Sequence, residues 1–156
     1  MDFRITGLSP EPFKPLFAKD AAALARLGAH CTIADDATSF PCRVSMAHAV
    51  PGEELILLSY EHQDAHSPYR ATGPIYVRKA ATSAYDGFNV VPEPVRARLL
   101  SVRAYDDQDL IVVADVVDGS VLETLIGKFF EHEEVAYLHL HYARRGCYAC
   151  RVDRVC

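Results

Sequence analysis

The C-terminal segment constrains the fold of this chain more than any other part of its sequence. In residues 137–142, YLHLHY, leucines alternate with histidines, which is the two-residue period of a β-strand. The Arg-Arg-Gly sequence at 144–146 places glycine where a three-residue hairpin loop needs a left-handed residue. We therefore predict two antiparallel strands, 135–143 and 147–155, joined by a tight turn.

The loop length fixes which side chains share a face of this hairpin. A three-residue loop sets opposite each other the pairs Ala143 and Cys147, His141 and Ala149, and Leu140 and Cys150. One face then collects the mainly apolar residues Leu138, Leu140, Tyr142, Tyr148, Cys150 and Val152. The other face collects the polar residues His139, His141, Cys147, Arg151 and Asp153.

The two cysteines of the CxxC at 147–150 point to opposite faces in this register. A zinc site needs convergent thiolates, and a thioredoxin-type motif needs its CxxC at a helix N-terminus. We therefore expect neither a zinc site nor dithiol chemistry here. Cys150 is expected to be a small core residue.

The two histidines of the strand raise a metal-binding hypothesis. Alternate strand residues are about 7 Å apart, so His139 and His141 can converge on one metal if a third ligand approaches. Candidate third ligands are His62, Glu61, Asp115 and Cys147. The alternative, which we favour, is that both histidines belong to a solvated or hydrogen-bonded polar face. We therefore expect no metal, with His139 and His141 as the candidates if one is bound.

Several residues are candidates for catalysis, although no reaction follows from them. The stretch YEHQDAHSPYR places His62 beside a carboxylate and near an arginine at the end of a strand, where loops often carry chemistry. Such a histidine is able to act as a general base or to organise the loop by hydrogen bonds. Cys147 and His141 form the one Cys/His pair that the predicted hairpin brings together. The catalytic candidates are thus His139, His141, His62 and Cys147.

Two arginines lie within otherwise apolar strand-like runs. Arg103 in LLSVRAY stands on a sheet face, where a guanidinium pairs with a carboxylate or an anionic ligand. An ion pair with Asp115 or Glu61 is the interpretation that we favour. Arg43 in FPCRVS points away from its neighbour Cys42, which we expect to be a buried structural thiol.

The rest of the chain predicts a mixed fold. Strands are expected at FRITGL, at 53–62, at 73–79, and as a hairpin from LLSVRAY to LIVVADVV that turns at residues 106–108. Asp20 is expected to cap a short helix that ends at Gly28. Because strands predominate without βαβ alternation, we predict an α+β class, with a largely antiparallel sheet and two or three flanking helices.

The clearest helix signal follows residue 119. Ser120 and Glu123 match the S-x-x-E capping box. The apolar residues after Ser120 recur at helical spacing and predict one buried stripe, formed by Leu122, Leu125, Ile126, Phe129 and Phe130.

Length and charge limit the function classes. A chain of 156 residues is expected to form a single domain over 1–156. The net charge of −5 argues against nucleic acid as a partner, and no apolar stretch is long enough to cross a membrane. Five cysteines without a disulfide framework, and an N-terminus unlike a signal peptide, favour the cytoplasm.

The sequence resembles a bacterial family that is classed as a domain of unknown function. The resemblance covers nearly the whole chain and is carried by the blocks FRITGL, FPCRVS, PGEELILLSYEH, SPYRATGPIYVR, RLLSVRAYD, ADVVDG and YLHLHYARRGCYACRVDR. It implies no activity, cofactor or substrate. In that family the position of Cys150 need not be cysteine.

Ionisable groups in apolar strands are costly without a partner, and this predicts a binding site. We expect a pocket for a small anionic or polar ligand on the polar face of the sheet. Arg103, Arg70 and Arg144 would bind the anion, and His139, His141 and His62 would supply hydrogen bonds or proton transfer. The alternatives are a metal-dependent enzyme that uses the HxH strand and a structural or interaction protein. The cofactor and the oligomeric state are unknown from the sequence.

Overall fold

The computed structural model describes residues 1–155, and within them nine strands form two antiparallel sheets. The larger sheet contains, in spatial order, β5 (Asp86–Phe88), β1 (Asp2–Thr6), β9 (Tyr148–Val155), β8 (Tyr137–Tyr142), β6 (Leu99–Tyr105) and β7 (Ile111–Asp118). The smaller sheet contains β2 (His30–Ile33), β3 (Glu54–Gln63) and β4 (Ala71–Arg78). The prediction of a mixed fold with antiparallel strands is confirmed, and helices are a minor part of it.

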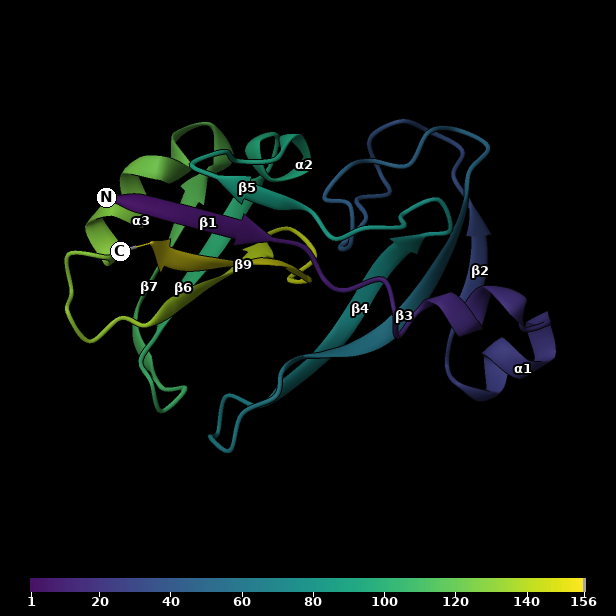
Figure 1. The fold of residues 1–156 in the computed structure, drawn as a ribbon, viewed down its shortest axis with the longest axis horizontal. Helices are drawn as coiled ribbons and strands as arrows, with labels where there is room; N and C mark the ends of the chain where they lie inside the picture. The colour runs from purple at the N-terminus through teal and green to yellow at the C-terminus, as the bar shows by residue number, and fades with distance from the viewer. Residues whose placement is uncertain (156) are drawn as a thin grey trace.

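The larger sheet carries the main core. Its apolar face includes Leu100, Leu138 and Val152, which are fully buried. The helices α2 (Glu93–Arg96) and α3 (Leu122–Phe129) lie beside this sheet (Figure 1). All five residues of the apolar stripe predicted for the second helix are buried in this core, so that prediction is confirmed. Each such side chain contributes about 1.5–3 kcal/mol to the free energy of unfolding.

The predicted capping box of α3 is wrong. A 3₁₀ turn, η2 (Gly119–Val121), precedes the helix and contains Ser120, so Ser120 is already part of a helical turn. Asp118 caps this turn instead, because its Oδ1 accepts from the backbone nitrogen of Ser120 at 2.9 Å. Glu123 is paired with Arg96 of α2 rather than with a backbone N–H.

The smaller sheet carries the N-terminal helices on one side (Figure 1). These are η1 (Lys14–Ala18), a 3₁₀ helix in the proline-rich segment, and α1 (Ala21–Arg26). The predicted cap is confirmed, since Asp20 Oδ1 accepts from the Ala23 nitrogen at 2.8 Å. Gly28 ends the helix with a φ of +68°. Leu24 of α1 packs on Ile56 of β3.

Two short strands were not predicted from the sequence. β2 is an edge strand with mostly exposed residues, and β5 has three residues at the edge of the larger sheet, within a segment predicted as a loop. Short polar edge strands carry little of the apolar alternation on which sequence prediction depends.

The β8–β9 hairpin confirms the predicted strands but not the length of their loop. The backbone nitrogen of Tyr142 donates to the Cys147 carbonyl at 2.9 Å, so four residues, 143–146, form the loop. Gly146 has a φ of +77°, as the predicted left-handed position requires. His141 consequently pairs with Tyr148 rather than with the predicted Ala149.

A β-bulge restores the predicted register one residue further along. The register shifts between Leu140 and His141, and Leu140 pairs with Cys150 as predicted. The bulge absorbs the extra loop residue, because Ala149 and Cys150 both lie in the main core. Tyr148 was predicted on the apolar face, but the shift places it opposite His141, on the polar face.

Candidate functional site

Tyr148 is the centre of a cluster of three histidines, His62, His139 and His141, which we call the histidine cluster. Its ring stacks on His62 of β3, with 5.1 Å between centroids and 13° between planes. The rings of His139 and His141 meet it edge-on at 5.1 and 5.8 Å. The structure therefore brings together all three histidines that the sequence singled out, and they join the larger sheet to the smaller one.

The imidazoles of β8 are held in the neutral form. Burial, with the nearby charges of other histidines and arginines, lowers the pKa of His139 to about 3. Burial and the charge of Arg103 lower the pKa of His141 to about 4. In each imidazole ring of the histidine cluster, one buried nitrogen has no hydrogen-bond partner within residues 1–155. These atoms are Nδ1 of His62, Nδ1 of His139 and Nε2 of His141.

The geometry of the histidine cluster differs from that of a metal centre. Among residues 1–155, no three His, Cys, Asp or Glu side chains are arranged so that they could hold a metal ion. The Nδ1 atom of His141 lies 3.1 Å from the Gly146 carbonyl, and the sulfur of Cys147 contacts the Arg145 carbonyl at 3.9 Å. The structure thus records no hydrogen bond between Cys147 and His141.

Arg103 and Arg70 occupy different parts of the fold. Arg103 pairs with His139 in the β6–β8 register, and its charge lowers the pKa of the three histidines. Within residues 1–155 it has no ion pair, so the favoured pairing with Asp115 or Glu61 is not observed. Glu61 instead accepts from Arg70 at 2.8 Å, and Asp64 lies 3.2 Å from the same guanidinium.

The second group of functional candidates lines a cavity of about 760 Å³ between the two sheets, which we call the arginine cavity. Its polar lining includes Arg43, Arg98, Arg144, Arg145, Tyr142 and Cys147. These residues come from the loop that carries Arg43, the residue before β6, the end of β8 and the segment between β8 and β9. None of the four arginines takes part in an ion pair within the described part of the chain. Of the residues predicted to bind a ligand, Arg144 lies here.

Arg43 is a buried cation that has no carboxylate partner within residues 1–155. It is 3% exposed, and its guanidinium donates from Nε to the Tyr148 carbonyl at 2.8 Å and from Nη1 to the Pro41 carbonyl at 2.6 Å. Burial lowers the pKa of Arg43. A buried charge is normally paired, because neutral carbonyl dipoles offset only part of its desolvation.

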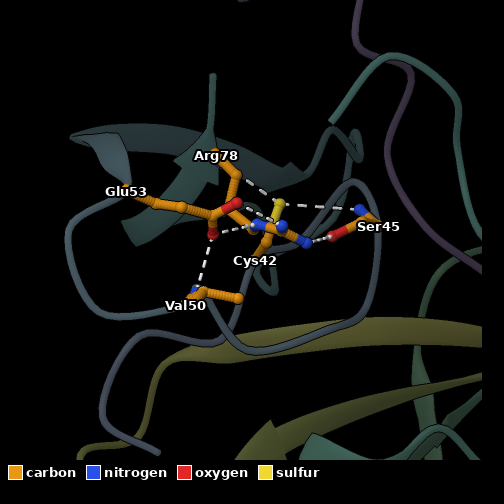
Figure 2. Close-up of polar contacts among 5 residues, drawn as sticks. All are labelled: Cys42, Ser45, Val50, Glu53 and Arg78. Atoms are coloured by element: carbon orange, nitrogen blue, oxygen red, sulfur yellow. Dashed lines mark hydrogen bonds and ion pairs between the residues drawn. The ribbon is translucent and has the colours of Figure 1, made fainter. Parts of the chain in front are cut away.

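The loop that carries Arg43 is fixed by a polar network, which Figure 2 shows. The sulfur of Cys42 accepts from the backbone nitrogens of Val44, Ser45 and Arg78 at 3.4, 3.5 and 3.3 Å. The expectation that Cys42 is a buried structural thiol is thereby confirmed. Arg78 is also paired with Glu53, which accepts from the Val50 nitrogen at 2.7 Å. Both ends of the loop are therefore tied to the smaller sheet.

Arg98 is held by neutral acceptors as well. Its Nη1 donates to the Pro94 carbonyl at 2.7 Å and lies 2.9 Å from Nε2 of His48. Its Nη2 donates to the Thr38 carbonyl. None of these partners carries a negative charge at neutral pH, so no hydrogen-bond partner within residues 1–155 compensates the charge of Arg98.

Tyr142 lies against both fixed guanidiniums. The guanidinium carbons of Arg43 and Arg98 are each 5.0 Å from the centre of its ring. Tyr142 is 6% exposed, and its buried hydroxyl has no hydrogen-bond partner within residues 1–155. Burial raises the pKa of this phenol, so it is a neutral donor. A buried hydroxyl without a partner calls for an explanation, and Tyr142 is one of the residues that line the arginine cavity.

The opposite wall of the arginine cavity is apolar. It comes from one face of the smaller sheet, where Leu57 of β3 pairs with Tyr76 of β4 and Pro74 lies on the same side. The cavity therefore offers cationic donors on one side and apolar contact on the other, within the size range of small-molecule sites.

Sequence reasoning missed Arg43 and Arg98 as site residues. Each lies in a segment that could have drawn attention to it. Arg43 lies within the largely apolar run FPCRVS, and Arg98 directly precedes the strand predicted in LLSVRAY. Both segments approach the β8–β9 hairpin only through tertiary contacts, which no local pattern contains.

A family model described as a protein of unknown function (DUF1203) matches residues 39–154, more than half of the chain. No curated protein and no solved structure matches the chain. In the described residues no helix is long and apolar enough to cross a membrane.

Proposed function

We propose a binding function for this chain, which belongs to the DUF1203 family of proteins of unknown function. The arginine cavity is a binding site for a small anionic ligand. One observation carries the proposal: four guanidinium groups line this cavity, and within residues 1–155 none of them has a carboxylate partner.

A bound anion would supply the negative charge that these arginines lack in the free protein. Desolvating a guanidinium is costly, and hydrogen bonds to carbonyl groups leave its charge in place. A carboxylate or phosphate accepts charge-assisted hydrogen bonds from guanidinium in a bidentate geometry. Ligand binding would therefore offset the free-energy cost of desolvating Arg43 and Arg98.

The histidine cluster takes a supporting part in this proposal. It shares Tyr148 with the cavity, because the carbonyl of Tyr148 accepts from Arg43. No histidine lines the cavity among the described residues, and Arg70 and Arg103 lie outside it as well. The four described cysteines are free thiols, which supports our placing this function in the reducing cytoplasm.

Thermal unfolding with a panel of phosphate, sulfate, citrate and acetate tests the proposal. A ligand that binds the native state raises its midpoint by mass action. We expect stabilisation by at least one of these anions, lost in Arg98→Met and retained in Arg26→Ala, an exposed arginine of α1 that serves as the control. Failure of every anion to stabilise the unmodified protein would count against the proposal.

A second candidate function, a metal-dependent enzyme, has one observation in its favour. His62, His139 and His141 each have a buried ring nitrogen without a partner. Their side chains would have to rearrange before three of them could coordinate one ion. Elemental analysis of untagged protein and of the double variant His139→Ala, His141→Ala tests this candidate: a near-stoichiometric metal lost in the variant supports it, and no metal in either protein rejects it.

A further inference from the structure

We propose that the natural ligand of the arginine cavity is an organic polyanion of the phosphate-ester class, which carries two or three negative charges and an apolar group. This inference rests on the proposed function and narrows it from anions in general to one chemical class. Charge, donor geometry and the apolar wall each contribute to it.

The charge of the cavity calls for more than one negative charge. Four guanidiniums line it, and Asp118 is the carboxylate in its lining within the described residues. Hydrogen bonds from Ser120 lower the pKa of Asp118, so this carboxylate is ionised at neutral pH. The lining thus carries a net charge of +3, since four cations face one anion. A monocarboxylate would leave two of these charges uncompensated.

Two fixed guanidiniums of the cavity lining are suited to bind a phosphate. Arg43 and Arg98 approach the ring of Tyr142 at the same distance, and each is fixed by backbone carbonyls before any ligand binds. A phosphate presents three oxygens and is able to accept from two guanidiniums at once, whereas a single carboxylate is satisfied by one bidentate guanidinium. The unpartnered Tyr142 hydroxyl adds a neutral donor.

The remaining two arginines differ in their freedom. Arg144 and Arg145 lie in the hairpin loop and are exposed. Exposed guanidiniums beside a cavity raise the local concentration of anions and are able to close on a second charged group. Two fixed and two exposed cations therefore suit a ligand with more than one anionic position.

The apolar wall argues against an inorganic ion as the natural ligand. Leu57, Pro74 and Tyr76 line the side that faces the smaller sheet, and none of them is able to neutralise charge. Water against such a wall is displaced favourably by an apolar group. A volume of about 760 Å³ exceeds what a single phosphate fills.

Calorimetric titration of the full chain at physiological ionic strength tests the charge requirement. The probes are pyrophosphate, inorganic phosphate and acetate. We expect pyrophosphate to bind one to one and about tenfold or more tightly than phosphate, with acetate weaker still, since each further charge-assisted hydrogen bond contributes about tenfold. The double variant Arg144→Ala, Arg145→Ala should lose at least about tenfold in pyrophosphate affinity, and Arg26→Ala should lose none.

This choice of variants keeps the test decisive. Arg98→Met removes a guanidinium that also bonds to backbone carbonyls, so a loss of binding in this variant does not distinguish a lost ligand contact from lost structure. The side chains of the exposed pair Arg144 and Arg145 have no such contacts among the described residues. Methyl phosphate and phenyl phosphate then test the apolar wall. We expect phenyl phosphate to bind about tenfold more tightly, an advantage that Leu57→Ser reduces.

The outcomes separate the inference from the proposed function. Acetate, phosphate and pyrophosphate of equal affinity, all dependent on Arg98, would leave an anion site but overturn the polyanion inference. Equal affinities for methyl and phenyl phosphate would overturn the apolar part of the inference. An absence of saturable binding by every probe would overturn both the inference and the proposed function.

Discussion

The Nη1 nitrogen of Arg98 lies 2.9 Å from the Nε2 nitrogen of His48. A guanidinium has donors only, so the imidazole accepts through Nε2 and carries its proton on Nδ1. That Nδ1 lies 2.8 Å from Glu93 Oε2, where it finds an acceptor. Burial and the charge of Arg98 lower the pKa of His48, which keeps this neutral form at pH 7. His48 thus orients a cation of the arginine cavity without lining it.

Replacing His48 should therefore weaken anion binding indirectly. We expect His48→Ala to lower pyrophosphate affinity by about fivefold, because Arg98 loses one acceptor worth roughly 1 kcal/mol. His48→Gln, whose amide oxygen is able to accept, should retain most of the affinity. Calorimetric titration of both variants measures this, and equal affinity of His48→Ala and the unmodified protein would show that His48 has no positioning role.

Stability should fall in mild acid because of the histidine cluster. His139 and His141 titrate near pH 3 and 4 in the folded protein, against an ordinary pKa of 6.5. The unfolded chain therefore binds their protons first as the pH falls below about 6.5, and stability present at pH 7 is lost toward pH 4. Each histidine should cost about 2 kcal/mol of unfolding free energy between pH 7 and pH 5.

Urea unfolding at pH 7 and pH 5 measures this loss. The double variant His139→Leu, His141→Leu has nothing to protonate at these positions, so its stability should change much less between the two pH values. An identical acid loss in the variant and the unmodified protein would mean that other groups account for it.

Tyr148 should contribute to stability through its ring rather than its hydroxyl. The ring is buried and stacks on His62, so it joins the two sheets. We expect Tyr148→Ala to lower the free energy of unfolding by about 3–5 kcal/mol and Tyr148→Phe to change it by about 1 kcal/mol or less. Chemical denaturation of both variants is the measurement. A Phe variant as unstable as the Ala variant would refute the assignment to ring packing.

The positive potential of the arginine cavity should make Cys147 react preferentially with an anionic alkylating reagent. Cys147 lines the arginine cavity together with the four arginines. Cys31, in contrast, is exposed, and its sulfur lies 3.5 Å from Glu54 Oε1. The ratio of iodoacetate to iodoacetamide labelling should be about tenfold higher at Cys147 than at Cys31, since a cationic cleft concentrates anions. Peptide mass spectrometry gives both ratios from one sample. Pyrophosphate should protect Cys147 from iodoacetate, and equal ratios at the two cysteines would contradict the electrostatic account.

The β8–β9 hairpin illustrates what the sequence is able to specify. Alternation and Gly146 predict both strands and the pairing of Leu140 with Cys150 correctly. The four-residue loop and the bulge are two departures that cancel in register, so they leave no trace in the apolar pattern beyond them. Their one lasting effect is to place Tyr148 among the histidines, which alternation alone could not predict.

The candidate site depends more heavily on tertiary structure. The histidines of one strand share a face by geometry, so two members of the histidine cluster were predictable and His62 was a candidate. Arg43 and Arg98 reach Tyr142 from positions 99 and 44 residues away in sequence. Such convergence is set by the packing of the two sheets, and no local periodicity encodes it.

The most direct test of the arginine cavity is anomalous diffraction from crystals soaked in tungstate, a heavy divalent oxyanion of tetrahedral shape. The account predicts an anomalous peak inside the cavity, with tungstate oxygens within hydrogen-bond distance of the guanidiniums of Arg43 and Arg98. A map with no peak in the cavity, or with peaks only at surface arginines such as Arg26, would contradict it.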